Sequence, residues 1–186
     1  VKYWFKCPVK KCDHDFESTL GNINAGKWCP YCSNNKLCEN NNCSICYDKS
    51  FARHEKSQYW HPTKNNKIIP RDKLKNSNDK YWFKCPDCDH DFDKALNSIN
   101  GGSWCPYCAN QKLCENNNCS ICYDKSFVSH EKSKYWHPTK NNEIIPRDKF
   151  KNSNDKYWFK CPEKKCGQDF ESTLGNINAG KWCPYC

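Results

Sequence analysis

The stretch KYWFKCPDCDHDFDKALNSINGGSWCPYC, residues 80–108, decides how this chain folds. It holds two cysteine pairs, Cys85 with Cys88 and Cys105 with Cys108, and 16 residues separate the pairs. Structural zinc takes four soft ligands in a tetrahedron, and two such pairs brought together by a hairpin supply them. The stretch therefore predicts a four-cysteine zinc site.

The same pattern occurs three times along the 186 residues. KYWFKC stands at 2–7, 80–85 and 156–161, and WCPYC stands at 28–32, 104–108 and 182–186, with a period of 76 to 78 residues. A fixed period of this kind is typical of repeat proteins. We therefore predict the C-terminal half of a repeat at 1–32, followed by full repeats at 33–108 and 109–186.

Zinc explains the 18 cysteines better than disulfides do. The chain is polar, with a mean hydropathy of −1.08, so staples and aromatic rings must replace an aliphatic core. No hydrophobic signal segment precedes the cysteines, no apolar run reaches membrane-spanning length, and Cys-x2-Cys pairs recur. We expect a zinc protein of an intracellular, reducing compartment, with no membrane partner.

Each repeat is expected to hold one four-cysteine zinc. The predicted ligand sets are Cys7, Cys12, Cys29 and Cys32; Cys85, Cys88, Cys105 and Cys108; and Cys161, Cys166, Cys183 and Cys186. His14 and His90 compete for the second ligand position, but the third copy has Gln168 there and keeps its cysteines. We therefore predict that His14 and His90 are not ligands, and that they lie at the surface or hydrogen-bond a ligand sulfur.

LCENNNCSICYDKSF, at 37–51 and again at 113–127, adds three cysteines to each full repeat. An odd number of cysteines leaves a disulfide scheme incomplete, so a histidine is expected to complete a zinc site. The predicted sets are Cys38, Cys43, Cys46 and His54, and Cys114, Cys119, Cys122 and His130. With five Zn2+ ions this scheme uses all 18 cysteines. The alternative set of Cys43, Cys46, His54 and His61 leaves Cys38 as a free thiol.

No catalytic arrangement is apparent in the sequence. In HEKSQYWH the second histidine, His61, follows His54 by seven residues, whereas a metalloprotease helix needs a spacing of four. Every predicted zinc has four protein ligands, while catalytic zinc keeps one position open. We expect no enzyme activity and no small-molecule substrate in this segment, and a nuclease domain elsewhere in a longer protein stays compatible with it.

Residues 50–108 resemble the probable zinc-ribbon, treble-clef repeat found in tandem in large DNA viruses and some bacteria. The shared features are Trp60, Asn65, Pro70, Ser77, the KYWFKC strand, the DHDF motif and CPYC, and the second copy matches through Trp136, Asn141, Pro146, Ser153 and CPYC at 183–186. The resemblance implies tandem treble-clef zinc fingers, and nucleic-acid work by association with nucleases. It also implies a viral setting such as host cytoplasm, viral factory or virion.

Local patterns predict small α+β modules with little regular core. Tyr81 and Phe83 alternate with Trp82 and Lys84, as in a half-buried strand. Residues 47–60 are expected to form a short helix with Asp48 as its N-cap, and a second helix is expected to run from Pro106 into 109–113.

The net charge of +9 favours a nucleic-acid partner, DNA or RNA. The predicted contacts are Arg71, Lys73, Lys75 and Lys84 in one repeat and Arg147, Lys149, Lys151 and Lys160 in the next. Exposed aromatic rings beside them suit base stacking, whereas the competing interpretation packs Trp60, Trp82 and Trp104 over the zinc sites. The alternative function is a structural or protein-binding zinc scaffold, for example a virion component.

Overall fold

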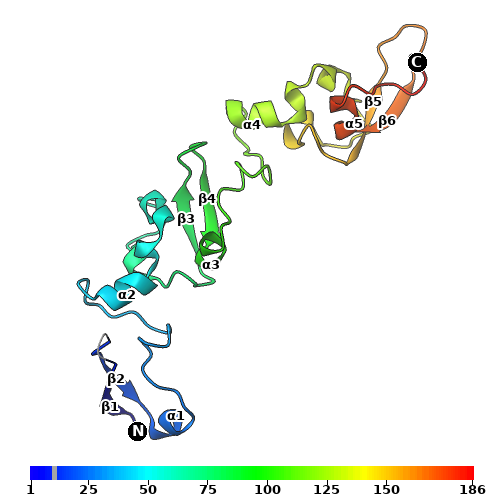
Figure 1. Cartoon of the computed structure of the whole chain (residues 1–186). Helices are drawn as coiled ribbons and strands as arrows, with labels where there is room; N and C mark the ends of the chain where they lie inside the picture. The colour runs from blue at the N-terminus through cyan, green and yellow to red at the C-terminus, as the bar shows by residue number, and fades with distance from the viewer. Residues whose placement is uncertain (10–11) are drawn as a thin grey trace. The chain divides into compact units, whose positions relative to one another are not determined.

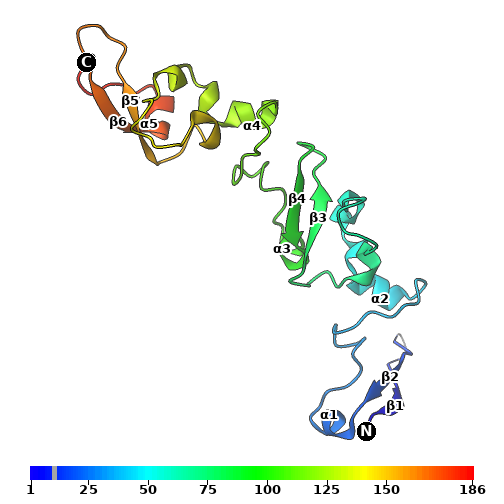
Figure 2. The same cartoon turned by 180° about the vertical axis from the view of Figure 1, so that it is seen from behind.

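The computed structural model describes residues 1–9 and 12–186, which form two compact units, Val1–Cys105 and Pro106–Cys186. Both units are built from β-hairpins, short helices and single 3-10 turns (Figure 1). The view from behind shows that each hairpin is followed directly by a helix (Figure 2). The fold class is therefore the predicted set of small α+β modules.

The elements follow the same order in each copy of the repeat. The first unit contains β1 (Tyr3–Lys6), β2 (Asp15–Ser18), α1 (Leu20–Asn24), α2 (Ser44–Lys49), η1 (Phe51–Arg53), η2 (Glu55–Tyr59), η3 (Pro70–Asp72), β3 (Lys80–Lys84), β4 (Asp91–Ala95) and α3 (Leu96–Asn100). The second contains α4 (Ser120–Lys125), η4 (Phe127–Ser129), η5 (Glu131–Tyr135), η6 (Pro146–Asp148), β5 (Lys156–Lys160), β6 (Asp169–Thr173) and α5 (Leu174–Asn178). Among the residues that the structure describes, no helix has both the length and the apolar character needed to cross a bilayer.

Each hairpin pairs two antiparallel strands in the same register. A phenylalanine of the first strand stands opposite one of the second: Phe5 with Phe16, Phe83 with Phe92, and Phe159 with Phe170. The predicted alternation in KYWFK is confirmed in β3, where the second and fourth residues are buried and the others are exposed. One face of the hairpin is therefore core and the other faces solvent.

Aromatic rings from the first half of the repeat cover the buried face of β3–β4. Phe51 and Phe83 are fully buried with their rings 5.7 Å apart, and Leu96 of α3 is fully buried as well. Trp60 stacks on Tyr81 at 4.7 Å and forms an isolated backbone bridge to Phe83. The second full repeat has the same core of Phe127, Phe159 and Leu174.

An asparagine fixes the loop after Trp60 to the hairpin. The Asn65 side chain donates to the Trp82 carbonyl at 2.9 Å and accepts from the Trp82 N–H at 2.8 Å. Asn141 makes the same two bonds to Trp158, at 2.9 and 2.8 Å. A side-chain amide thus satisfies the outer backbone groups of a strand that has a single partner strand in its sheet.

The first helix prediction was wrong in position, and the second was wrong because residues 106–113 form turns and irregular structure. α2 begins at Ser44 with Cys43 as its N-cap, and Asp48 lies inside it. The helix ends before Ser50, which is fully buried, extended and bridged to Leu74. Pro106 opens turns instead of a helix, because Asn110 at φ 54° reverses the chain and the Gln111 N–H returns to the Pro106 carbonyl.

The core predicts a strong contrast between two equivalent leucines. Leu96 is 0% exposed beneath the aromatic rings, whereas Leu20, at the same place after β2, is 60% exposed. Leu96→Ala should cost about 2–5 kcal/mol of local stability because it removes fully packed methyl groups. Leu20→Ala should change stability by about 0.5 kcal/mol or less. Hydrogen exchange of the zinc-loaded chain measures both, and equal losses of protection would contradict this packing.

Candidate metal centres

Five groups of side chains bring four ligand atoms each to within 4.8 Å of one another. Three are the predicted four-cysteine sets, and two combine three cysteines with a histidine. Their members are Cys7, Cys12, Cys29 and Cys32; His14, Cys38, Cys43 and Cys46; Cys85, Cys88, Cys105 and Cys108; His90, Cys114, Cys119 and Cys122; and Cys161, Cys166, Cys183 and Cys186. The predicted number of zinc sites, five, is confirmed.

The sulfur separations fit a tetrahedral zinc. Cys7 and Cys32 lie 3.5 Å apart between Sγ atoms, and Cys12 and Cys29 lie 3.6 Å apart. A tetrahedron with Zn–S bonds of about 2.3 Å places its sulfurs about 3.8 Å apart. A disulfide would need about 2.05 Å. The gathered free thiols therefore fit zinc ligation.

The backbone just after the second cysteine of the first knuckle has the same conformation in all three copies. The residue after the second cysteine is left-handed: Asp13 at φ 44°, Asp89 at φ 57° and Gly167 at φ 57°. The N–H of the first cysteine then donates to the carbonyl one residue further on, at 2.9–3.0 Å. The turn therefore depends on a left-handed backbone and tolerates histidine or glutamine at the next position.

His14 belongs to a metal centre, which corrects the prediction that it is not a ligand. Its Nε2 lies 3.4 Å from the Cys43 sulfur and 3.7 Å from the Cys46 sulfur. Its Nδ1 lies 3.1 Å from the Cys12 sulfur of the adjacent four-cysteine group. The part of the prediction that assigned His14 a hydrogen bond to a ligand sulfur agrees with this contact.

The histidine of the fifth group has the same spacing to its three cysteines. His90 precedes Cys114, Cys119 and Cys122 by 24, 29 and 32 residues, and His14 precedes Cys38, Cys43 and Cys46 by the same three spacings. These four side chains form the fifth group. Identical spacing in two copies was the sequence signal for the fourth ligand, and a search restricted to histidines that follow the cysteines missed it.

The structure places His54 and His130, the predicted fourth ligands, outside these groups. His54 stacks on Phe51 with ring centres 5.1 Å apart, and its Nδ1 accepts the Lys56 N–H at 3.1 Å. His130 does the same with Phe127, at 5.2 Å. Burial lowers the pKa of both histidines, so both rings are neutral at pH 7. They act as caps of η2 and η5.

His61, the other histidine weighed as a ligand, holds a loop in place. It is 8% exposed, its Nδ1 accepts the Lys64 N–H at 3.2 Å, and its Nε2 lies 3.1 Å from Asp91. His137 makes the corresponding contact with Asp169. The hydrogen bond from Lys140, helped by that from His137, lowers the pKa of Asp169, so this carboxylate is charged at neutral pH.

Half of the predicted nucleic-acid contacts are occupied within the fold. Arg71 and Arg147 are each 7% exposed and donate to the Asn40 and Asn116 carbonyls at 2.9 Å. Lys73 and Lys149 lie over tyrosine rings at 5.6 and 5.7 Å. All four side chains therefore have contacts inside the fold.

Of the remaining predicted contacts, Lys84 and Lys160 are exposed and Lys75 and Lys151 are half-buried. Lys84 pairs with Asp89 at 3.0 Å. In the described part of the chain, no ion pair is found for Lys75, Lys151 or Lys160.

Tandem hairpins closed by cysteine clusters define a class of small zinc-stapled modules, and the comparisons agree. The model of the probable treble clef zinc finger domain matches residues 57–111 and 133–186, so the chain belongs to this family. It is 35% identical to an uncharacterized protein of Acanthamoeba polyphaga mimivirus over 186 residues, covering 96% of this chain and 43% of that protein. The chain thus spans less than half the length of this viral relative. The resemblance predicted from the sequence is confirmed.

The family match covers some of the metal sites. It includes the four-cysteine groups of the two full repeats. Cys38–Cys46 and Cys114–Cys122 precede the matched segments. The group of His14 therefore has all four of its ligands outside the matched segments, and the group of His90 has three of its four outside them.

Five bound zinc ions are expected in the purified protein. Structural zinc contributes on the order of 10–16 kcal/mol of apparent binding energy per site in small peptides, more than these thin cores supply. Native mass spectrometry should count five ions, and strong chelation should abolish the hairpin signals in NMR spectra. Fewer than five ions at saturating zinc, or cysteines joined as disulfides under reducing conditions, would contradict the assignment.

Proposed function

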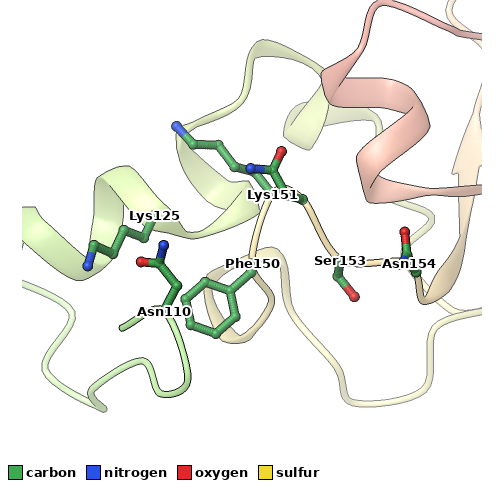
Figure 3. A pocket seen from close by; sticks show the side chains of 7 residues that line it. Asn110, Lys125, Phe150, Lys151, Ser153 and Asn154 are labelled. Carbon is green, nitrogen blue, oxygen red and sulfur yellow. The ribbon is translucent and has the colours of Figure 1, made fainter. Parts of the chain in front are cut away.

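We propose that this zinc-binding repeat protein binds nucleic acid through its phosphates, with little sequence preference. The main support for phosphate binding is a pocket that recurs at equivalent positions of the two full repeats. In the second unit it has a volume of about 460 Å3 and is lined by Asn110, Lys125, Phe150, Lys151, Asn152, Ser153 and Asn154 (Figure 3). In the first unit it measures about 190 Å3 and is lined by Asn34, Lys49, Leu74, Lys75, Asn76 and Ser77.

The lining of this pocket suits a phosphate. Each lining includes two lysines, asparagines and a serine, and neither includes a carboxylate. Figure 3 shows Lys125 and Asn110 to the left of Phe150, Lys151 above it, and Ser153 and Asn154 to the right. Lys125 Nζ is oriented by the Tyr107 carbonyl at 2.6 Å and has further donors for a ligand. Donors without competing acids favour an anion.

Little sequence preference follows from the arginines. The chain has three, Arg53, Arg71 and Arg147. Two of them are buried, and the third pairs with Asp48 at 3.7 Å. The guanidinium groups that could read guanine through two hydrogen bonds are therefore already engaged within the protein. The remaining cations are lysines, which contact phosphates as point charges.

The zinc-loaded charge limits the strength of the interaction. Eighteen thiolates add eighteen negative charges and five Zn2+ ions add ten positive ones, so the formal net charge falls from +9 to +1. Attraction then depends on local lysines and has little long-range component. This near-neutral balance favours a second candidate function, a metal-stapled scaffold that binds protein partners.

We propose no catalytic role for the five metal-ligand groups. Each of the five groups already offers four protein ligands, whereas a catalytic zinc keeps a position for water or substrate.

The pockets predict a salt-dependent affinity. The variant Lys75→Ala/Lys151→Ala should weaken binding of the zinc-loaded chain to mixed-sequence DNA or RNA. For duplex DNA it should flatten the slope of log K against log salt by about 0.9 for each phosphate that the variant no longer neutralises. Titrations from low to physiological ionic strength measure both effects.

Lys27→Ala/Lys181→Ala is the matched control, because it removes the same charge from exposed positions that line neither pocket. Equal weakening by both variants would refute the pocket as the contact. A chain that fails to bind nucleic acid even at low salt would leave the scaffold as the function.

A further inference from the structure

We propose that the three-cysteine zinc is a clasp between consecutive repeats, in which His14 coordinates that ion through Nε2 and hydrogen-bonds the neighbouring four-cysteine centre through Nδ1. His14 belongs to the hairpin of residues 1–32, and Cys38, Cys43 and Cys46 belong to the segment that opens the next repeat. One imidazole thus serves two metal centres at once.

The geometry of the His14 ring supports both roles. Its two nitrogens face opposite clusters, with Nδ1 3.1 Å from Cys12 Sγ and Nε2 3.4 Å from Cys43 Sγ. Tyr31 of the same module stacks on the ring at 4.3 Å. A histidine that ligates zinc commonly donates its other N–H to a fixed acceptor, and a zinc-bound thiolate is such an acceptor. The contact fixes the tautomer that leaves Nε2 available for metal.

Other contacts join the same two segments. Ile45 of α2 packs against the core formed by Cys7, Cys12, Phe16 and Cys29 of the first hairpin. Lys49, at the end of α2, donates to the Cys32 carbonyl at 3.0 Å. The metal therefore closes an interface that already has an apolar and a polar contact.

Arg71 secures the clasp from the other side. Its buried guanidinium donates to the Asn40 carbonyl at 2.9 Å and lies 3.9 Å from the Cys38 sulfur. Arg147 repeats this with the Asn116 carbonyl at 2.9 Å and the Cys114 sulfur at 3.8 Å. Zn2+ with three thiolates and one neutral imidazole has a net charge of −1, so the guanidinium compensates it. Arg71 thereby ties the cluster to the treble-clef part of its own repeat.

The third copy shows what the hairpin does without the histidine. Gln168 replaces it, yet β5 and β6 pair in the same register and the Gln168 carbonyl accepts the Cys161 N–H at 2.9 Å. Tyr185, at the place of Tyr31, is 66% exposed. Glutamine at this position therefore leaves the hairpin folded, which makes it the substitution of choice.

His14→Gln should lower the zinc count of the intact chain from five to four in native mass spectrometry, and His90→Gln should do the same. Hydrogen exchange of His14→Gln should show reduced protection at α2, while β1–β2 stays protected by its own four cysteines. His54→Gln is the control and should keep five ions. The clasp is overturned if His14→Gln retains five ions, if α2 keeps its protection after the zinc is released, or if the control loses zinc.

Arg71→Gln should release the zinc of Cys38, Cys43 and Cys46 at about ten-fold lower chelator concentration, since partners of ligands typically change metal affinity 10- to 100-fold. Arg53→Gln, which removes an exposed guanidinium, should leave the release unchanged. Release is followed by the absorption of the Co2+-substituted protein, where a centre with three sulfurs and one nitrogen differs from four-sulfur centres. Identical release curves for the two variants would remove Arg71 from the clasp.

Discussion

The gathering of cysteine sulfurs around each metal position is the constraint on which the rest of this structure depends. Strands of four or five residues in isolated pairs are marginal in water, and this chain has such hairpins in place of a larger sheet. Thiolates 3.5–3.6 Å apart would repel one another strongly without a cation. Zn2+ reverses that repulsion and closes the open end of the hairpin, so that a few aromatic rings suffice to cover its face.

Zinc binding by the thiolates also changes the net charge of the protein. With neutral thiols and no metal the chain has a formal charge of +9, and with five ions and eighteen thiolates it has +1. The metal-free chain is thus the more cationic of the two forms. After zinc binding, positive charge is concentrated at the lysines of the repeated pockets and of the exposed hairpin faces. The choice between a nucleic-acid partner and a protein partner therefore depends on these positions and not on overall composition.

Much of the fold was predictable because its signals are local and repeated. Fixed cysteine spacing, the alternation of Tyr81 and Phe83 with polar neighbours, and the internal period led directly to zinc-closed hairpins. The helix at Ser44–Lys49 was misplaced because its end is set by a tertiary contact, the bridge from Ser50 to Leu74. Arg71 and Arg147 were misread because a basic residue in a polar segment gives no local sign of burial. Their role depends on a carbonyl 31 residues away.

The number of cysteines determines how many metal sites exist. It does not determine which histidine is the fourth ligand of a three-cysteine site. Using all 18 cysteines required two sites with one histidine each, and that requirement is met equally by His54 and His130 or by His14 and His90. Gln168 correctly indicated that the four-cysteine site does not need the histidine. It gave no information on whether the histidine is a ligand of the neighbouring three-cysteine site. A ligand that crosses from one repeat to the next is invisible when each repeat is treated as closed. A fragment that begins at residue 33 would keep Cys38, Cys43 and Cys46 and lose His14. The four-cysteine groups thus lie within single repeats, while the histidine–cysteine groups extend across the repeat boundaries.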